Sequence, residues 1–283
     1  SPNAITIISS DEIEARQSFA VSDLLRTVPG LSIAKSGGNG QFTQLRTRGS
    51  EANHTMVLID GIEVNDPAGA DEFNFATLTT SNIDRIEVIR GPQSALWGSD
   101  AMAGVINIIT KKAEKGVKAG ASFEQGSHST SQQSFNVGIG NDRGGANFFL
   151  SHVDSGGSNI SRFGAEDDGF QILTINSNGE YQINDLFKMQ IHGRYEEADT
   201  ETDSGFPFVS DSDTGLDTRN SVVGLKISNS LLKSALLSQL DLNWTSSNNN
   251  AMNAQNASTS KTSADKYELA YQSTFNFQIP TAP

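Results

Sequence analysis

The sequence predicts a mixed α+β domain at the N-terminus, followed by antiparallel strands of a transmembrane β-barrel. Two observations predict this fold class. The composition changes near Lys111-Lys112, where a compact segment of mixed helices and strands gives way to Ser-, Asn- and Gly-rich sequence. Beyond that point apolar and polar residues alternate with a period of two, which is typical of strands with one apolar and one polar face. We therefore expect two domains, residues 1–112 and 113–283.

The N-terminal domain is predicted to mix short helices with short strands. The run Ser9-Ser10-Asp11 offers an N-cap for the first helix, and Pro29-Gly30 ends the second, because proline cannot continue a helix. Asp60-Gly61 tolerates positive φ at both positions, which favours a hairpin turn. The expected elements are a strand (4–8), a helix from about residue 11, a helix (about 21–28), strands (31–34 and 45–48) and a hairpin (56–64).

Residues 88–110 are the most informative segment and read VIRGPQSALWGSDAMAGVINIIT. The segment predicts a strand, an Arg-Gly-Pro break, one short helical turn and a second apolar strand. Together with VLIDGIEV upstream and the alternating strands downstream, it resembles the plug domain of TonB-dependent outer-membrane transporters. The resemblance covers roughly residues 1–112 and implies that this domain fills a barrel of about 22 strands.

Strands of alternating polarity follow this segment, for example at residues 117–124, 186–196 and 267–277. Strands of about 9 to 11 residues with one apolar face suit a barrel wall between lipid and a wet lumen. The connections between about eight such strands alternate between short and long, so every long loop emerges on one side. Short connections are expected at 141–144, 184–185 and 230–234, and long ones at 125–131, 154–168, 197–217 and 246–262.

The predicted number of strands is too small for a closed barrel around a folded domain. Barrel diameter grows with strand number, so about eight strands cannot enclose a plug of about 110 residues. We therefore expect an incomplete barrel, about 8 of about 22 strands, with an unpaired edge. A soluble β-rich binding protein is the alternative, since sandwich strands also alternate, but sandwich connections have no reason to sort by length.

The composition argues against several classes of protein. A formal net charge of −13 argues against nucleic-acid binding, because phosphate contacts need clustered lysine and arginine. The absence of cysteine excludes disulfides and thiolate metal sites. No run approaches the ~18 apolar residues of a spanning helix, which excludes helical spanning only. Phosphate-binding and nucleophile motifs are absent and the four histidines are scattered, so we do not expect an enzyme.

Two Gly-rich loops, residues 35–43 and 65–75, lack periodicity, and each carries an aromatic side chain. From the residues alone they are either flexible surface loops or binding loops. In the TonB-dependent family the apical plug loops contact the substrate, and the resemblance gives these two loops that role. The substrate-binding candidates are Asn39, Gln41, Asp66, Ala68 and Gly69.

Three arginines lie beside acidic residues in the same domain, and buried charges persist only when they are paired. The resemblance implies that such pairs hold the plug against the barrel interior. Ordinary surface ion pairs are the alternative. The arginines are Arg48, Arg85 and Arg90, and the acidic residues are Glu51, Asp84 and Glu87.

The second and third long loops are rich in carboxylates, which repel one another unless they are solvated or bridged by a cation. A solvated acidic rim is one interpretation. Resemblance to the cobalamin-transporting members of the family implies the other, in which Ca²⁺ orders these loops before substrate binds. The candidate ligands are Asn159, Glu166, Asp168, Asp203 and Asp217, of which Asn159 and Glu166 replace aspartates of those members.

The resemblance implies binding and transport without bond making. The expected activity is TonB-dependent uptake of a scarce metal-chelate nutrient, cobalamin, across the outer membrane of a Gram-negative bacterium. The expected partners are the TonB energy-coupling protein, outer-membrane lipid and the small-molecule chelate, and structural Ca²⁺ is the expected cofactor. A siderophore receptor of the same fold is the alternative.

Overall fold

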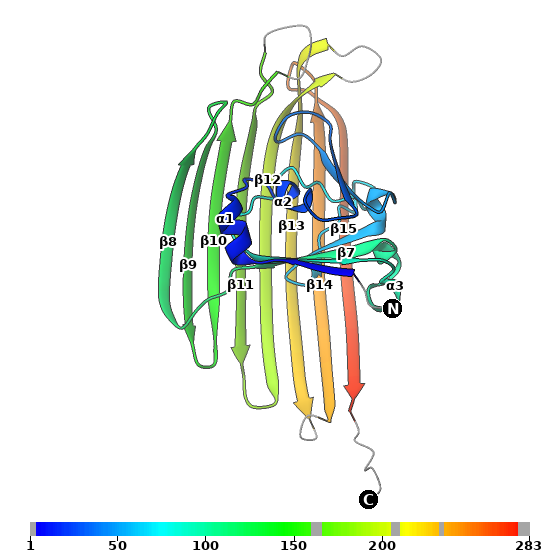
Figure 1. Cartoon of the computed structure of the whole chain (residues 1–283), viewed down its shortest axis with the longest axis vertical. Helices are drawn as coiled ribbons and strands as arrows, with labels where there is room; N and C mark the ends of the chain where they lie inside the picture. The colour runs from blue at the N-terminus through cyan, green and yellow to red at the C-terminus, as the bar shows by residue number, and fades with distance from the viewer. Residues whose placement is uncertain (1–3, 160–165, 205–209, 232–234, 277–283) are drawn as a thin grey trace, which may run out of the picture.

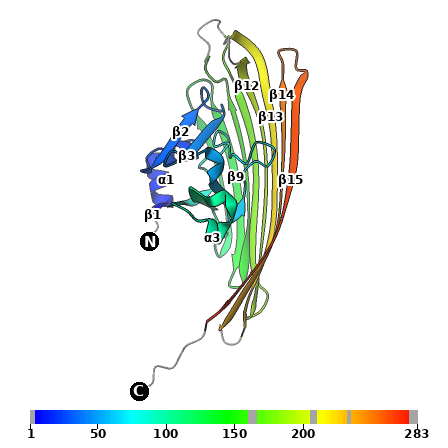
Figure 2. The same ribbon diagram turned by 90° about the vertical axis from the view of Figure 1, so that its right-hand side faces the viewer.

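The computed structural model describes residues 4–159, 166–204, 210–231 and 235–276. A small N-terminal domain lies against the concave face of a tall antiparallel sheet (Figures 1 and 2). Both parts have the fold class that the sequence predicts. We call residues 4–110 the plug and the tall sheet, which begins at Gly116, the wall.

The plug is built on a five-stranded sheet with the order β1-β6-β7-β4-β5. β4 and β7 are parallel, and the other neighbouring pairs are antiparallel. A hairpin of β2 and β3 forms a second small sheet. The plug elements are β1 (Ala4–Ile8), α1 (Ser10–Arg16), α2 (Val21–Leu25), β2 (Leu31–Lys35), β3 (Thr43–Thr47), η1 (Ala52–His54), β4 (Thr55–Ile59), β5 (Ile62–Glu63), β6 (Ile83–Arg90), α3 (Ser94–Trp97), η2 (Ser99–Ala101) and β7 (Gly104–Thr110).

The two plug helices begin and end for local reasons. The Ser9 hydroxyl accepts a hydrogen bond from the Glu12 N–H (3.3 Å), which satisfies one free donor at the start of α1. α2 ends at Leu25, earlier than predicted, because the backbone changes there from α-helical to 3₁₀-type hydrogen bonding. The Thr27 N–H donates to the Leu24 carbonyl, three residues back, and the proline that follows prevents further helix.

The Asp60-Gly61 turn between β4 and β5 forms as predicted. Both residues have positive φ, 52° at Asp60 and 83° at Gly61, which is the combination that a two-residue hairpin turn requires. The Asp60 carboxylate reaches the end of β7, where it accepts hydrogen bonds from the Thr110 N–H (2.8 Å) and hydroxyl (2.6 Å). The turn thus fixes the point at which the chain leaves the plug sheet.

Aliphatic side chains from the helices and the central sheet form the main core of the plug. Leu24 of α2 and Ile106 and Ile108 of β7 are fully buried. Val222 of the wall joins the same cluster, and Phe19 of the plug packs against a small buried cluster on the wall. Burial of apolar surface is therefore concentrated inside the plug, and Val222 and Phe19 add apolar contacts between plug and wall.

The wall is an up-and-down meander in which each of its eight strands pairs with its neighbours in sequence, so β8 and β15 are its edges. We call the end that carries the β8–β9, β10–β11 and β14–β15 connections the outer end; the β9–β10 and β11–β12 connections lie at the opposite, inner end (Figure 1). The wall strands are β8 (Gly116–Gln125), β9 (Ser131–Asn141), β10 (Gly144–Ser155), β11 (Phe170–Gln182), β12 (Phe187–Ser204), β13 (Ser210–Leu231), β14 (Leu236–Met252) and β15 (Ser258–Phe275).

Two connections predicted as long loops are largely strand. β12 continues to Ser204 and β13 begins at Ser210, and only residues 253–257 separate β14 from β15. Asp199 and Asp217 are register partners in this extension, where the backbone ladder continues beyond the apolar part of the strands. The loop prediction was wrong because a solvated strand has the same polar composition as a loop.

Alternation along the strands separates an apolar outer face from a polar inner face. On β12, Ile191 is 52% exposed, whereas the neighbouring His192 is 7% exposed and faces the plug. On β15, Tyr267 and Tyr271 are 78% and 69% exposed. Phe277, the last residue of the predicted pattern on this strand, lies outside the described residues. Across the described ranges, none of the helices has the length and apolar character needed to cross a membrane.

Candidate functional site

The first predicted substrate-binding loop, residues 36–42 between β2 and β3, reaches the wall near its outer end. Gln41 is only 5% exposed, and its Nε2 donates a hydrogen bond to the Glu201 carbonyl oxygen on β12. Asn39, in contrast, is exposed. The loop therefore presents Asn39 to solvent and Gln41 to the wall.

The second predicted loop follows β5 and is anchored to β14. The Asp66 Oδ1 accepts a hydrogen bond from the Ala68 N–H (2.8 Å), and its Oδ2 accepts one from Asn249 Nδ2 (2.8 Å). Gly69 lies so close that a Cβ there would come 2.6 Å from Asp66 Oδ2. The three predicted residues of this loop are half-buried and form one turn, which Asp66 ties to the wall.

The outer end brings together three of the five predicted metal ligands. Glu166, Asp168 and Asp203 each place a carboxylate oxygen within 4.8 Å of the others. Asp168 is 3% exposed. Carboxylate oxygens are the donors that Ca²⁺ prefers. The donor set fits a calcium ion.

A glycine lets the acidic loop between β10 and β11 close at its base. Gly157 has a φ of 68°, and a Cβ at this position would lie 1.7 Å from the Asp168 carbonyl oxygen. Any other residue would push the two ends of the loop apart. The close approach of Gly157 holds the end of β10 beside Asp168, just before β11.

The remaining two predicted ligands lie differently. The Asn159 N–H donates to the Asp167 carboxylate (2.9 Å), in the same loop as Asp168. Asp217 lies on β13 opposite Asp199 of β12. Within the described residues, Asp217 does not belong to the group of three close carboxylates.

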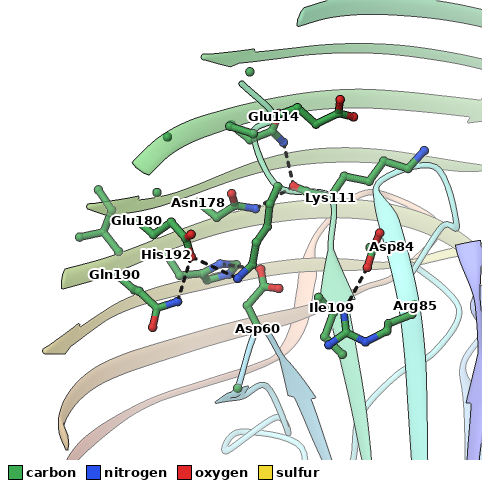
Figure 3. A pocket seen from close by; sticks show the side chains of 18 of the residues that line it. Asp60, Asp84, Arg85, Ile109, Lys111, Glu114, Asn178, Glu180, Gln190 and His192 are labelled. Carbon is green, nitrogen blue, oxygen red and sulfur yellow. Dashed lines mark hydrogen bonds and ion pairs between the residues drawn. The ribbon is translucent and has the colours of Figure 1, made fainter. Parts of the chain in front are cut away.

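A cavity of about 850 Å³ lies between the plug and wall strands β8–β13 (Figure 3). Its lining includes Asp60 and His192, whose Oδ2 and Nδ1 atoms are 3.0 Å apart and whose side chains are largely buried. Asn178 of β11 donates to the Thr110 hydroxyl (2.8 Å) and to the Lys111 carbonyl oxygen (3.1 Å). This polar network connects the β4–β5 turn and the exit of the plug to two wall strands.

Two plug carboxylates at the interface have opposite pKa shifts. Burial acts to raise the pKa of Asp60, but His192 and the hydrogen bonds from Thr110 outweigh it, so the pKa lies below its ordinary value. Burial also raises the pKa of Glu63, and here the ion pair with Lys266 of β15 (2.7 Å) offsets only part of the effect. The Asp60 carboxylate is therefore held in its charged form. The charged form of Glu63 is only partly stabilised by Lys266, so the pKa of Glu63 stays above its ordinary value.

Thr77 makes a further buried contact with the wall. Its hydroxyl donates to Glu196 Oε1 on β12 (2.6 Å), and Arg194 pairs with the other carboxylate oxygen of Glu196. Thr77 and Glu196 are each 4% exposed. The polar phase of β12 indicates that His192 and Glu196 face inward, but no sequence signal identifies Thr77, Asp60 or Glu201 as a contact between plug and wall.

Two of the three predicted arginines make ion pairs or hydrogen bonds to groups of the plug itself. Arg85 pairs with Asp84 (3.1 Å) and Glu87 (2.8 Å), both on its own strand β6. Arg90 donates to the Thr6 hydroxyl (2.7 Å) of the adjacent strand β1. Arg85 therefore forms the surface ion pairs that the residues alone also allow, and Arg90 bonds a neutral group of the plug.

Comparison with known proteins gives matches to both parts of the chain. Residues 1–105 match the model of the TonB-dependent receptor plug domain. The vitamin B12 transporter BtuB of Vibrio vulnificus strain CMCP6 is 33% identical over 206 residues, which is 71% of this chain and 33% of the relative. The protein of the same name from strain YJ016 is 32% identical over 201 residues, 70% of this chain and 33% of the relative. The chain spans about a third of the length of these relatives.

Solved structures share the arrangement of plug and wall. The siderophore receptor PirA from Acinetobacter baumannii has a TM-score of 0.71 and 18% identity, covering 95% of this chain and 44% of that one. The ferripyoverdine receptor of Pseudomonas aeruginosa has a TM-score of 0.76 and 15% identity, covering 99% of this chain and 40% of that one. At these identities the likeness shows the fold alone.

Proposed function

We propose that this chain, which belongs to the TonB-dependent receptor family, serves the TonB-dependent uptake of cobalamin across the outer membrane. The TonB-dependent receptor family is not an enzyme family. One observation carries the choice of cobalamin. The identity to the vitamin B12 transporter extends over 206 residues, so it covers more than the 105 residues of the plug match and includes wall sequence.

The outer face of the wall supports a location in lipid. Ile139 of β9, Ile191 of β12 and Val223 of β13 are 60%, 52% and 52% exposed, and all three lie on interior strands of the sheet. Exposed apolar side chains of this kind are costly in water and suit the lipid side of an outer-membrane barrel. A soluble β-rich binding protein gives no reason for them.

The proposed substrate site lies at the outer end, between the plug loops and the wall. Asn39 is exposed there, and Ala68 and Gly69 are half-buried in the turn that Asp66 anchors. Exposed main-chain and amide groups on an anchored turn can recognise a polar ligand without large rearrangement. The TonB protein is the proposed partner that moves the plug after substrate has bound.

Calcium is the proposed structural cofactor of the outer end. Glu166, Asp168 and Asp203 would hold it, and Asn159 belongs to the same loop. The ion would supply positive charge that cancels the repulsion among the three carboxylates. The protein's own part is to bring β12 and the acidic loop together, which orders the rim beside the substrate.

A siderophore receptor is the second candidate, because the structural neighbours PirA and the ferripyoverdine receptor bear that function in their names. Their low identity supports the fold and not the substrate. The two candidates differ in the ligand that binds, so direct competition between cobalamin and ferric chelates separates them.

The decisive experiment measures the affinity of the intact protein for cobalamin with Ca²⁺ and with a chelator. We expect binding that weakens when Ca²⁺ is removed, and that weakens similarly in Asp168→Ala. Asp142→Ala is the matched control, since this carboxylate is 84% exposed at the inner end. Absence of cobalamin binding in both conditions contradicts the substrate, and binding unaffected by the chelator or by Asp168→Ala contradicts the calcium site.

A further inference from the structure

We propose that Gly40, Gln41, Phe170 and Glu201 form a clasp that couples the plug loop 36–42 to the acidic loop before β11, so that ordering one loop orders the other. These are positioning residues. The consequence for transport rests on the proposed function: the clasp sets the position of the exposed Asn39 beside the substrate.

The first contact of the clasp is a buried hydrogen bond between distant parts of the chain. Gln41 and Glu201 are 160 residues apart in sequence, and the Gln41 amide donates to the Glu201 main-chain carbonyl oxygen. The Gln41 carbonyl oxygen in turn accepts a hydrogen bond from the Thr43 hydroxyl (2.9 Å), which holds its backbone. A buried amide aimed at a main-chain acceptor fixes the loop in one position.

The second contact is a close approach of an aromatic ring to the loop backbone. Gly40 has a φ of 83°, and a Cβ there would lie 2.4 Å from Phe170 Cγ. Phe170 is 4% exposed and packs in a buried wall cluster. Only glycine allows the ring to lie on the loop at this point, so the fit is specific to both partners.

Glu201 connects this contact to the acidic loop. Its carboxylate Oε2 accepts a hydrogen bond from the Gly169 N–H (2.7 Å), and its own N–H donates to the Gly169 carbonyl oxygen (2.9 Å). The Glu201 carbonyl oxygen is the acceptor for Gln41. One residue therefore bonds the plug loop through its main chain and the acidic loop through its side chain and main chain.

Because each loop is held through the same residue, opening either loop removes a contact that orders the other. Such coupling is reciprocal: a change in the plug loop must be felt in the acidic loop to the same extent as the reverse. In this arrangement Gln41 holds the plug loop in position, and the exposed Asn39 of the same loop contacts the substrate.

Hydrogen–deuterium exchange on the intact protein in detergent tests the clasp without substrate or added metal. We expect Gln41→Ala to lower the protection of amides 36–42 and also of amides 166–170, by about fivefold, the effect of losing one hydrogen bond. Glu201→Ala should do the same in both segments. Glu201→Gln should restore protection, because its amide oxygen can still accept from Gly169. Gly40→Ala should give a larger loss than Gln41→Ala in both segments.

The matched control is Thr77→Val, which removes a different hydrogen bond between plug and wall and should leave both segments unchanged. The clasp is wrong if Gln41→Ala affects only amides 36–42 while Glu201→Ala affects only amides 166–170. Equal loosening by Thr77→Val also contradicts it, since the effect would then be global. Cobalamin affinity is measured separately, so coupled exchange without cobalamin binding rejects the substrate and leaves the clasp standing.

Discussion

The interior of the plug and its contact with the wall are held by different chemistry. The plug core is mainly aliphatic, with Leu24 and Ile106 at 0% exposure. The interface with the wall depends mainly on polar pairs such as Asp60 with His192, and a cavity of about 850 Å³ lies beside that pair (Figure 3). Val222 and Phe19 are apolar exceptions, since Val222 reaches from the wall into the plug core and Phe19 packs against a buried wall cluster.

This difference assigns stability and movement to separate parts of the molecule. Apolar burial holds the plug together, and removing it requires unfolding. Polar contacts can exchange protein partners for water at a small net cost for each bond. The plug can therefore shift against the wall at a lower cost than that of losing its own fold.

The largest effect is expected inside the plug core. Ile106→Ala should lower the free energy of opening of β7 by about 2–5 kcal/mol, because a fully buried side chain leaves a cavity. Amide exchange of β7 in the intact protein measures this. Ile5→Ala, on edge strand β1 with 57% exposure, is the control and should cost below about 1 kcal/mol. Equal effects of the two variants would show that the core is not the source of plug stability.

An intermediate effect is expected at the interface. Thr77→Val keeps the shape of the side chain but removes a donor to the buried Glu196, which costs about 1–3 kcal/mol. Amide exchange should rise in residues 74–79 and stay unchanged in β7. Thr80→Val is the matched control, since its hydroxyl donates within the plug, to the Ser18 carbonyl oxygen (2.6 Å). A rise in the amide exchange of β7 with Thr77→Val would show that the plug core and the interface with the wall do not open separately.

A smaller effect is expected from the titration of Asp60. Its folded pKa lies below the ordinary 3.8, so its contribution to stability is fully present above that value and is lost as the pH falls through the folded pKa. Asp60→Asn should remove this acid dependence and cost roughly 1 kcal/mol at neutral pH, since Thr110 keeps an acceptor. Stability of the plug–wall contact measured against pH in the two proteins checks this. An unchanged acid limb in Asp60→Asn would assign the dependence to other carboxylates.

The sequence predicted the fold where local chemistry decides it. Ser9 capped the first helix, Asp60-Gly61 made the turn, and period-two alternation gave the inward face of β12. The strand extensions beyond about residue 197 were missed because their polar residues have the composition of a loop, although the backbone ladder continues through them. The polarity of its residues indicates whether a strand faces solvent or an apolar surface. It does not indicate at which residue the backbone hydrogen bonds of the strand end.

The sequence pointed to residues that lie close together, and it did not point to the contacts that connect them to the plug. Three candidate ligands, Glu166, Asp168 and Asp203, come together although two lie in a loop and one on β12. The contact between Gln41 and Glu201 has no local signal, because a main-chain acceptor 160 residues away is set by the docking of two domains. Contacts of this kind depend on tertiary placement, which residue type and spacing do not encode.

The smallest effect is expected for the arginine pairs that the sequence suggested as plug anchors. Arg85 is 43% exposed and pairs with Glu87 on its own strand, and an exposed pair is worth below about 1 kcal/mol. Arg85→Met should therefore change neither the opening of β7 nor the exchange of residues 74–79 by a measurable amount, and high salt should not distinguish it from wild type. Thr77→Val, measured alongside, shows what loss of an anchor looks like. If Arg85→Met instead loosened the plug from the wall as Thr77→Val is expected to do, the charged pairs on β6 would be interface contacts. The interface would then include exposed charges as well as the buried polar groups of β12.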